Sequence, residues 1–260
     1  MDKAFNLGRL FGIKFRLHFS WFVIFIVVTG LLVSPHYSEW ENWLIAIATS
    51  LLFFASVVAH ELAHGLVGRA NGIPVESITL FIFGGVAQMT KEATRPGAEL
   101  RMAVSGPVSS LLIGGVFALF LVIPGLPEPI AVMVFWLALM NTMLAVFNLI
   151  PGFPLDGGRI FRSLLWYVTG SYIRASRIAM RLGQGIGYLF IIGGIVIIFR
   201  RPFELSWFEG VWIAFIGWFL ENAASASYRQ IRRQEALSSF VAVEAIPSYR
   251  SSVSLDVDVD

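Results

Sequence analysis

Long apolar runs dominate this 260-residue chain and restrict its fold more than any other feature of the sequence. Hydrophobic residues make up 57% of the chain and charged residues 14%, whereas a soluble domain is typically about half apolar and about a quarter charged. A membrane-spanning helix needs roughly 20 apolar residues. Six runs approach that length, at about 17–33, 43–68, 100–123, 130–150, 183–200 and 207–224. We therefore predict an all-α polytopic membrane protein with six transmembrane helices in residues 1–227, followed by a polar tail or linker at 228–260.

The basic residues are distributed unequally between the segments that join these runs. Of the 19 Lys and Arg residues, only Arg200 and Arg201 fall on the side that would face outward. Because cytoplasmic loops of membrane proteins carry an excess of Lys and Arg, we expect an even number of spans with both termini in the cytoplasm. The first residues show no cleavable signal peptide. The chain contains no cysteine, which excludes disulfides and thiolate metal ligands and fits a prokaryotic plasma membrane.

The second run contains the sequence HELAH at residues 60–64, in the middle of apolar residues. Helical residues four apart lie on one face, so His60 and His64 can direct both imidazoles at one metal ion. Glu61 lies about 100° around the helix and can reach a metal-bound water without being a ligand. Two imidazoles without a thiolate suit zinc. The alternative is a membrane helix with two packing histidines, but ionisable groups within a membrane are costly and usually functional.

A catalytic zinc ion needs a third protein ligand and an open coordination position. His36 lies in an external loop on the wrong side of the membrane, and His18, at the start of the first run, is expected to be interfacial. Asp156 is the better candidate, because it follows two prolines that end the fourth helix in NLIPGFPLDGGRIF, residues 148–161. On local sequence alone, Asp156 could equally cap a helix that starts there. The predicted topology favours a ligand, since it brings Asp156 and His60 to the same cytoplasmic depth.

The segment PVESITLFIFGGVAQM, residues 74–89, predicts a different local structure. It is rich in β-branched and aromatic residues and has a break at Gly84–Gly85, which indicates a hairpin or a bent strand. An exposed strand edge can pair with an extended substrate by strand addition. We therefore predict that Phe83, Gly84 and Gly85 contribute to substrate binding. The alternative is a cytoplasmic hairpin that only packs on the bundle.

HELAH in the second run, together with NLIPGFPLDGGR after a later one, resembles the site-2 protease family of intramembrane zinc metalloproteases, peptidases of the M50 type. The resemblance covers roughly residues 5–225. It implies one Zn²⁺ per chain, held by His60, His64 and Asp156, with Glu61 as general acid and base. Asn148 matches an Asn of the family motif, which implies a role in holding the substrate backbone or the oxyanion; a helix-packing amide is the alternative. Relatives also have a membrane re-entrant β-loop at the position of the predicted hairpin.

The resemblance implies an enzyme that hydrolyses peptide bonds within or near transmembrane segments, with a zinc-bound water as the nucleophile. The expected partners are a transmembrane protein substrate and the lipid bilayer, and no nucleic acid. The chain lacks a PDZ-like insertion and is similar to the sporulation-protease branch, whose members often carry a C-terminal pair of CBS domains. Residues 228–260 correspond to the linker after which such a regulatory domain would follow in relatives, and a regulatory domain or a nucleotide-sensing partner is a further partner that the resemblance implies.

Two other functions are weighed against proteolysis. A catalytically silent membrane-protein binder would usually have lost Glu61 or a metal ligand, and this sequence retains all of them. A zinc transporter would need metal-binding groups along a route across the membrane. The predicted external half offers only His36 and a few acids, including Glu39, Glu41 and Glu128, so transport ranks last. The sequence does not specify the substrate or the oligomeric state.

Overall fold

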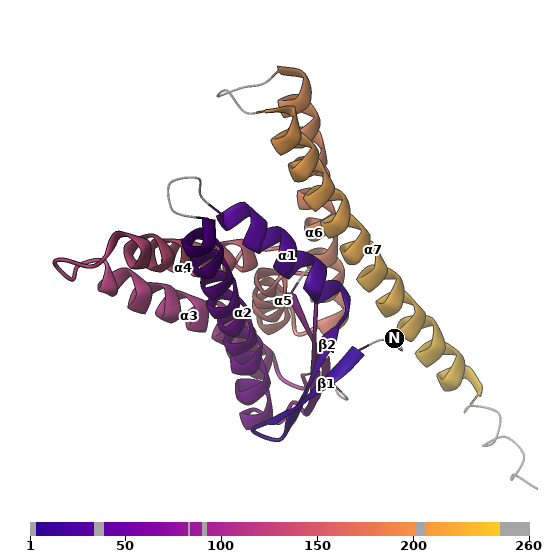
Figure 1. Ribbon diagram of the computed structural model, residues 1–260. Coiled ribbons are helices and arrows are strands. Elements are labelled where there is room, and N and C mark those ends of the chain that lie inside the picture. The colour runs from indigo at the N-terminus through magenta and orange to yellow at the C-terminus, as the bar shows by residue number, and fades with distance from the viewer. Residues whose placement is uncertain (1–3, 34–38, 83, 90–92, 201–205, 245–260) are drawn as a thin grey trace, which may run out of the picture.

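The computed structural model of the protein is mostly helical and describes residues 4–33, 39–82, 84–89, 93–200 and 206–244 (Figure 1). Seven helices and four strands follow one another along these residues. In chain order the elements are β1 (Ala4–Leu10), β2 (Ile13–His18), α1 (Ser20–Leu32), α2 (Glu39–Ala70), β3 (Val75–Phe81), β4 (Gly84–Met89), α3 (Pro96–Phe120), α4 (Glu128–Asn148), α5 (Asp156–Thr169), α6 (Tyr172–Arg200) and α7 (Trp207–Glu244).

Four helices in the described part of the chain are long and apolar enough to cross a membrane, and they correspond to the second to fifth predicted runs. These helices are Trp40–Ala70, Pro96–Phe120, Glu128–Asn148 and Tyr172–Arg200. The first predicted run falls on α1, an apolar helix of 13 residues. The sixth falls on the first half of α7 and includes Glu209 and Glu221. The described residues thus contain four helices that meet the length and composition of a span, where the sequence predicts six.

Two helices extend beyond the apolar runs from which they were predicted. Helix α6 begins at Tyr172, well before residue 183, and its added first turns contain Arg174, Arg177 and Arg181. Arginine lowers the local hydropathy but is a good helix former, so a prediction from apolar runs places the start of this helix too late. Helix α7 likewise continues to Glu244, into the stretch that the sequence predicts as a polar tail.

The N-terminal segment forms a β-hairpin, and the prediction of an all-α fold with a single later hairpin is wrong on this point. Strand β2 pairs with β1 in antiparallel fashion and with β3 in parallel fashion, which gives a four-stranded sheet of order β1-β2-β3-β4. Side chains of β2 alternate in burial: Ile13, Phe15 and Leu17 are buried, whereas the polar residues between them are partly exposed. This alternation is typical of a half-buried strand. The alternating segment is short and directly precedes a long apolar run. Because that run dominates the local hydropathy, the sequence analysis did not predict the strand.

The sheet packs against the C-terminal half of α2. A Cβ added to Gly65 of α2 would lie 2.7 Å from the Ile13 side chain and 3.5 Å from that of Ile78, so helix and sheet approach closely at this glycine. The predicted hairpin of residues 74–89 is present as β3 and β4, which pair in antiparallel fashion with Phe81 opposite Gly84. Strand β4 is at the edge of the sheet and contacts α2.

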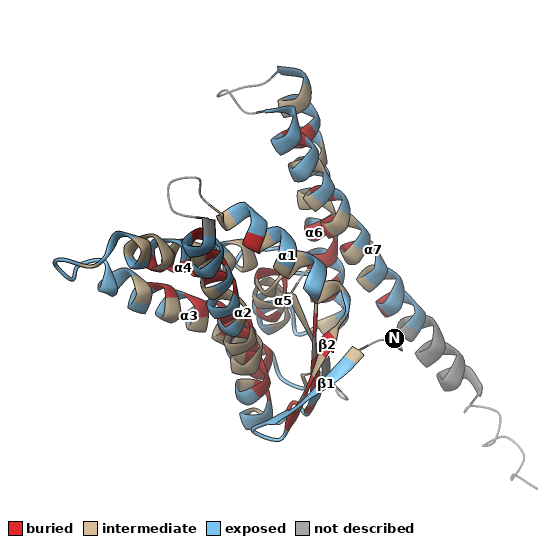
Figure 2. Cartoon of the chain, viewed as in Figure 1, coloured by how far each residue is buried: buried red, intermediate tan, exposed pale blue. Residues whose placement is uncertain are grey.

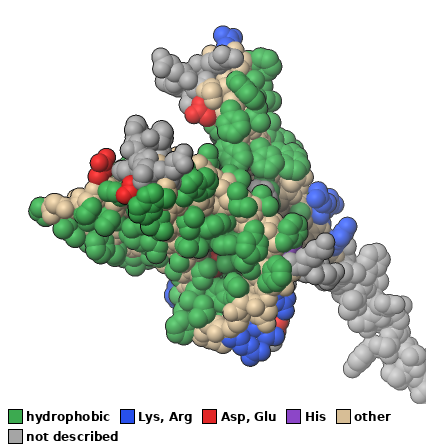
Figure 3. Space-filling view, in the orientation of Figure 1, with side chains coloured by type: hydrophobic (Ala, Val, Ile, Leu, Met, Phe, Trp, Pro, Cys, Tyr) green, Lys and Arg blue, Asp and Glu red, His purple; other side chains and the backbone are tan. Residues whose placement is uncertain are grey.

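The helices form a bundle from which one helical pair projects (Figure 1). Helix α2 packs against α3 and α4, α5 packs between α3 and α6, and α6 and α7 lie along each other. Buried residues face the inside of the bundle, whereas outward helix surfaces are exposed (Figure 2). Many exposed side chains are apolar, including Leu112, Val146 and Ile192. Apolar side chains cover the middle of the face shown in Figure 3, as expected for a surface in contact with lipid.

Candidate active site

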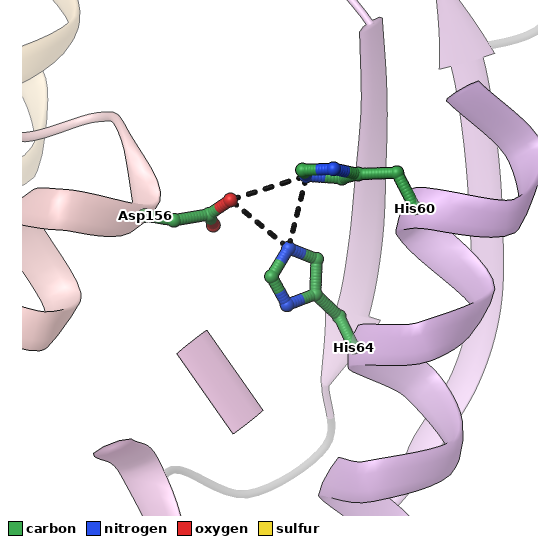
Figure 4. A group of neighbouring side chains, drawn as sticks. All are labelled: His60, His64 and Asp156. Atoms are coloured by element: carbon green, nitrogen blue, oxygen red, sulfur yellow. Dashed lines mark hydrogen bonds and ion pairs between the residues drawn. The ribbon is translucent and has the colours of Figure 1, made fainter. Parts of the chain in front are cut away.

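Two histidines of α2 and the first residue of α5 point toward one another (Figure 4). The Asp156 Oδ2 atom lies 3.0 Å from His64 Nε2 and 3.2 Å from His60 Nε2. The two Nε2 atoms lie 3.2 Å apart. His60 and His64 are buried, and the Asp156 side chain is 15% exposed. The structure therefore brings together the three residues that the sequence analysis names as a ligand set, although Asp156 lies 92 and 96 positions after the two histidines.

Helix α3 holds both imidazoles from behind. The Nδ1 atom of His64 donates a hydrogen bond to the Met102 carbonyl oxygen at 2.7 Å. Because a carbonyl can only accept, this bond puts the proton on Nδ1 and leaves a lone pair on Nε2 of the neutral ring. The Nδ1 atom of His60 lies 2.9 Å from the Ser110 hydroxyl, which can accept in the same way. Such partners orient metal-binding histidines and fix their tautomer. The sequence analysis missed Met102 and Ser110, which lie in an otherwise ordinary apolar run.

The donor atoms fit a zinc ion. Two imidazole nitrogens and one carboxylate oxygen are the ligand types of many catalytic zinc sites. In a tetrahedral site with bonds of about 2.0–2.1 Å, neighbouring ligand atoms lie roughly 3.3 Å apart. The distances between the donors of His60, His64 and Asp156 are 3.0–3.2 Å, which is close to that spacing. Lone pairs that converge so closely repel one another unless a cation lies between them, so these residues suit a metal ion.

Gly106 of α3 leaves the space beside the two imidazoles open. A Cβ added to this glycine would lie 2.1 Å from His64 Nε2 and 2.7 Å from His60 Nε2, far inside van der Waals contact. Any larger residue would therefore displace the ligand atoms or fill the space in front of them. Gly106 stands four residues before Ser110 on the same face of α3. Helix α3 thus orients the histidines through hydrogen bonds and, at Gly106, leaves space next to their Nε2 atoms.

Asp156 does not act as the cap of the helix that it begins. The N-cap residue of α5 is Leu155, and no side chain caps this helix end. The chain folds back tightly before Asp156: a Cβ at Gly157 would lie 2.3 Å from the Ile150 carbonyl oxygen, and one at Gly158 would lie 2.5 Å from the Phe153 nitrogen. The fold of the preceding segment, and not a helix-capping bond, therefore places the Asp156 carboxylate beside the two imidazoles.

Glu61 lies beside this cluster and against the edge of the sheet. It lies close enough to His64, His60 and Asp156 to interact with them electrostatically. A Cβ added to Gly85 of β4 would lie 2.4 Å from Glu61 Cγ and 2.5 Å from Cδ. The absence of a side chain at Gly85 thus lets the strand lie directly on the Glu61 side chain. Gly84 begins the same strand with a φ of 120°, and Phe83 falls outside the described residues.

The other polar residues considered from the sequence lie outside the cluster. The Asn148 side-chain amide donates to the Leu144 carbonyl oxygen of its own helix at 2.9 Å, a helix-internal bond that leaves its predicted substrate role untested. His18 pairs with the Ser20 hydroxyl at 2.8 Å, at the start of α1. His36 falls outside the described residues. Within the described part of the chain, His60, His64 and Asp156 form the one group of acids and histidines close enough to hold a metal ion.

Replacing Ser110 by Ala is expected to weaken zinc binding by about 10- to 100-fold, because the His60 ring would lose the partner that fixes its orientation. Competition with a chelator of known affinity measures this change on the purified chain. Ser109→Ala is a matched control, since the Ser109 hydroxyl donates to the Gly106 carbonyl oxygen of its own helix and has no other partner among the described residues. Equal zinc affinity of the Ser110 variant and the wild type would contradict the assigned role.

Comparison with known proteins agrees with this geometry. Residues 48–131 and 127–193 match the model of peptidase family M50. The chain is 42% identical over 253 residues to "Putative zinc metalloprotease sll0528" of Synechocystis sp., covering 95% of this chain and 65% of that protein. It is 36% identical over 263 residues to "Putative zinc metalloprotease Rip3" of Mycobacterium tuberculosis, with coverage of 95% and 64%. The chain thus spans just under two thirds of the length of these relatives.

A solved structure has the same fold. The site-2 protease from Methanocaldococcus jannaschii superposes with a TM-score of 0.60 at 29% sequence identity, over 86% of this chain and 95% of that one. The family match includes both HELAH and the start of α5, so it contains all three converging residues. The chain therefore belongs to peptidase family M50 and has the fold of a site-2 protease.

Proposed function

We propose that this chain is an intramembrane zinc metalloprotease that cuts peptide bonds within or near transmembrane segments of other membrane proteins. The observation that carries the proposal is the convergence of His60, His64 and Asp156 at 3.0–3.2 Å, with Glu61 beside them. These side chains come from an apolar helix and from the element that follows another apolar helix. Family membership supports zinc as the metal and peptide hydrolysis as the reaction.

The proposed topology has six spans, with α1 and α7 as the first and last, and both termini in the cytoplasm. The bias of Lys and Arg toward one side supports this topology. In this arrangement α2 runs inward, and His60 lies about 20 residues, or roughly 30 Å, from its outer end. The site would then lie near the cytoplasmic surface of the plasma membrane, where water can enter. The hairpin of β3 and β4 would reach into the membrane beside it, as a re-entrant segment.

In the proposed mechanism, His60, His64 and Asp156 hold one zinc ion. Zinc, when bound, polarises the scissile carbonyl and makes a nearby water molecule more acidic. Glu61 accepts a proton from the attacking water and then delivers it to the nitrogen of the leaving amine. Hydrogen bonds from Nδ1 of His64 to the Met102 carbonyl oxygen and from Nδ1 of His60 to the Ser110 hydroxyl leave Nε2 of each ring to face the reaction centre. Asn148 stands at the end of α4 as a further candidate for contact with the substrate.

Strand β4 is proposed to receive the substrate. A helical segment must unwind before its carbonyl groups become available for attack, and an extended segment can pair with a free strand edge. Strand β4 pairs with β3 on one side and is otherwise an edge of the sheet. Gly85 lies directly on Glu61, so a segment that adds to this strand would lie beside the proposed general base.

The metal content of the purified chain tests the proposed centre. We expect one zinc per chain in the wild type and almost none when His60 and His64 are both replaced by Ala. In sealed vesicles, the wild type is expected to bind zinc without transporting it, which separates the protease from a zinc transporter. Zinc retained by the double variant, or steady zinc uptake into vesicles, would contradict the proposal.

A further inference from the structure

A buried ion pair joins α3 to α5 next to the candidate active site. Glu99 of α3 is 1% exposed and accepts a hydrogen bond from Arg162 Nε at 2.8 Å. A second guanidinium nitrogen contacts the same carboxylate oxygen, Oε1. The other oxygen of Glu99 is buried and has no hydrogen-bond partner among the described residues. The side-chain hydrogen bonds of this buried acid are therefore directed at Arg162.

Two aromatic rings hold the guanidinium group of Arg162 in place. Its Cζ atom lies 4.8 Å from the centre of the Phe153 ring and 4.8 Å from that of Tyr172. Such cation–π contacts suit the flat guanidinium group. Phe153 belongs to the segment that leads into Asp156, and Tyr172 is the first residue of α6. Arg162 thus ties the middle of α5 to α3, to the segment that precedes Asp156 and to the start of α6.

Helix α3 packs against both helices that carry the proposed metal ligands, α2 with the two histidines and α5 with Asp156. Met102 and Ser110 of α3 fix the rings of His64 and His60, respectively. Among the described residues, the hydrogen-bond partners of the Asp156 side chain are the two histidines themselves, and the N-cap residue of its helix, Leu155, makes no side-chain cap. Arg162 stands six residues after Asp156, about 9 Å along α5, and forms an ion pair with Glu99 that links this helix to α3. The distance between Asp156 and the two histidines therefore depends on how α5 is held against α3.

We propose that the pair of Glu99 and Arg162 positions Asp156 for zinc binding, by fixing α5 against the helix that also orients the two histidines. This inference rests on the proposed zinc centre and adds two positioning residues to it. A buried ion pair contributes little net stability compared with well-packed apolar residues. The need to place Asp156, the third ligand, accurately therefore explains this costly pair better than a gain in stability does.

Zinc affinity is the readout that separates positioning from a merely structural role. Glu99→Gln and Arg162→Gln are each expected to raise the Kd for zinc by about 10- to 100-fold, the range typical of residues that support metal ligands. The double variant is expected to lose no more than either single one, because the two residues act as a unit. Arg162→Lys keeps the charge but loses the planar fork, so a smaller loss is expected. Chelator competition on the purified chain in detergent measures each Kd.

Thr29→Val provides the matched control. The Thr29 hydroxyl donates to that of Ser50 at 2.9 Å, in a buried bond between α1 and α2 away from the metal centre. This variant is expected to lower the unfolding temperature and leave the zinc Kd unchanged. If the Glu99 and Arg162 variants behave in the same way, with altered stability and unchanged zinc affinity, the positioning role is wrong.

The outcomes also separate this inference from the proposed function. A wild type that binds no zinc would overturn both. A wild type that binds zinc and cleaves substrate, beside pair variants of unchanged zinc affinity, would overturn only the role of Glu99 and Arg162. If a single variant does not fold, the double variant Glu99→Gln/Arg162→Gln decides the matter, since it removes the pair without leaving a buried charge unpaired: a Kd equal to that of the wild type contradicts the positioning role.

Discussion

Replacing Glu61 by Gln is expected to reduce peptide-bond cleavage by about 10²- to 10⁴-fold, the range typical of a general acid or base, while zinc binding is retained. Glutamine has nearly the same shape as glutamate but cannot accept and return a proton at neutral pH. The three converging donors, His60, His64 and Asp156, are unchanged in this variant. Cleavage of a single-span model substrate and zinc content, measured on the same preparation, check both parts of the prediction.

Glu76→Gln is the control for this experiment, because Glu76 is an exposed carboxylate on β3 and is not part of the cluster. It is expected to cleave at the rate of the wild type. Equal cleavage by the Glu61 variant and the wild type would remove Glu61 from the mechanism. Loss of zinc from the Glu61 variant would instead make Glu61 a metal ligand, contrary to the arrangement described above.

Replacing Gly106 by Ala is expected to raise the Kd for zinc by roughly 100-fold or more, because even changes in residues that only support the ligands cost 10- to 100-fold. The added Cβ would lie 2.1 Å from His64 Nε2 and 2.7 Å from His60 Nε2, so the imidazoles would have to move away from their positions. Cleavage is expected to be lost together with zinc. Chelator competition and the cleavage assay measure the two effects.

Gly115→Ala is the matched substitution on the same helix. A Cβ at Gly115 meets no atom within 4 Å, and Ala is favoured over Gly within a helix by roughly 1 kcal/mol. This variant is therefore expected to keep both zinc affinity and activity. Wild-type zinc affinity in the Gly106 variant would show that the space beside the histidines is not needed for the metal.

The residues proposed for the chemistry could be predicted from the sequence because their spacing indicates which side chains lie close together. HELAH on a helix puts His60 and His64 on one face by local geometry alone. The role of Asp156 could not be predicted from its local sequence alone, because that sequence fits a helix cap as well as a metal ligand. The charge distribution resolved this by indicating that both segments end on the same side of the membrane. The structure places Asp156 Oδ2 within 3.2 Å of both imidazoles, as this argument requires.

The supporting residues could not be predicted in the same way. Helix α3 packs against α2 at one particular rotation about its axis, and this rotation brings Gly106, Ser110 and Met102 next to the two histidines. No local sequence pattern specifies that rotation. The pair of Glu99 and Arg162 joins residues 63 positions apart, and each alone is typical of a charged helix end at the cytoplasmic surface. Their partnership follows from the packing of α5 on α3.

The sheet shows a similar limit. Strand β2 has the alternation of a half-buried strand, but a segment this short becomes a strand only if it finds a partner. Its partner β3 is more than fifty residues away, and the pairing is parallel. The hairpin of β3 and β4 was predictable because its two strands are adjacent in the sequence and its turn is marked by glycines.

Cleavage by the purified wild-type chain is the most direct test of the central claim. A single-span model substrate is incubated with the zinc-loaded chain, with the chelated chain, and with the chelated chain after zinc is restored, and the products are mapped by mass spectrometry. We expect one cut within or next to the transmembrane segment, lost on chelation and recovered with zinc. Cleavage that survives complete removal of zinc, or cuts confined to flexible segments far from the span, would contradict the assignment of this chain as an intramembrane zinc metalloprotease.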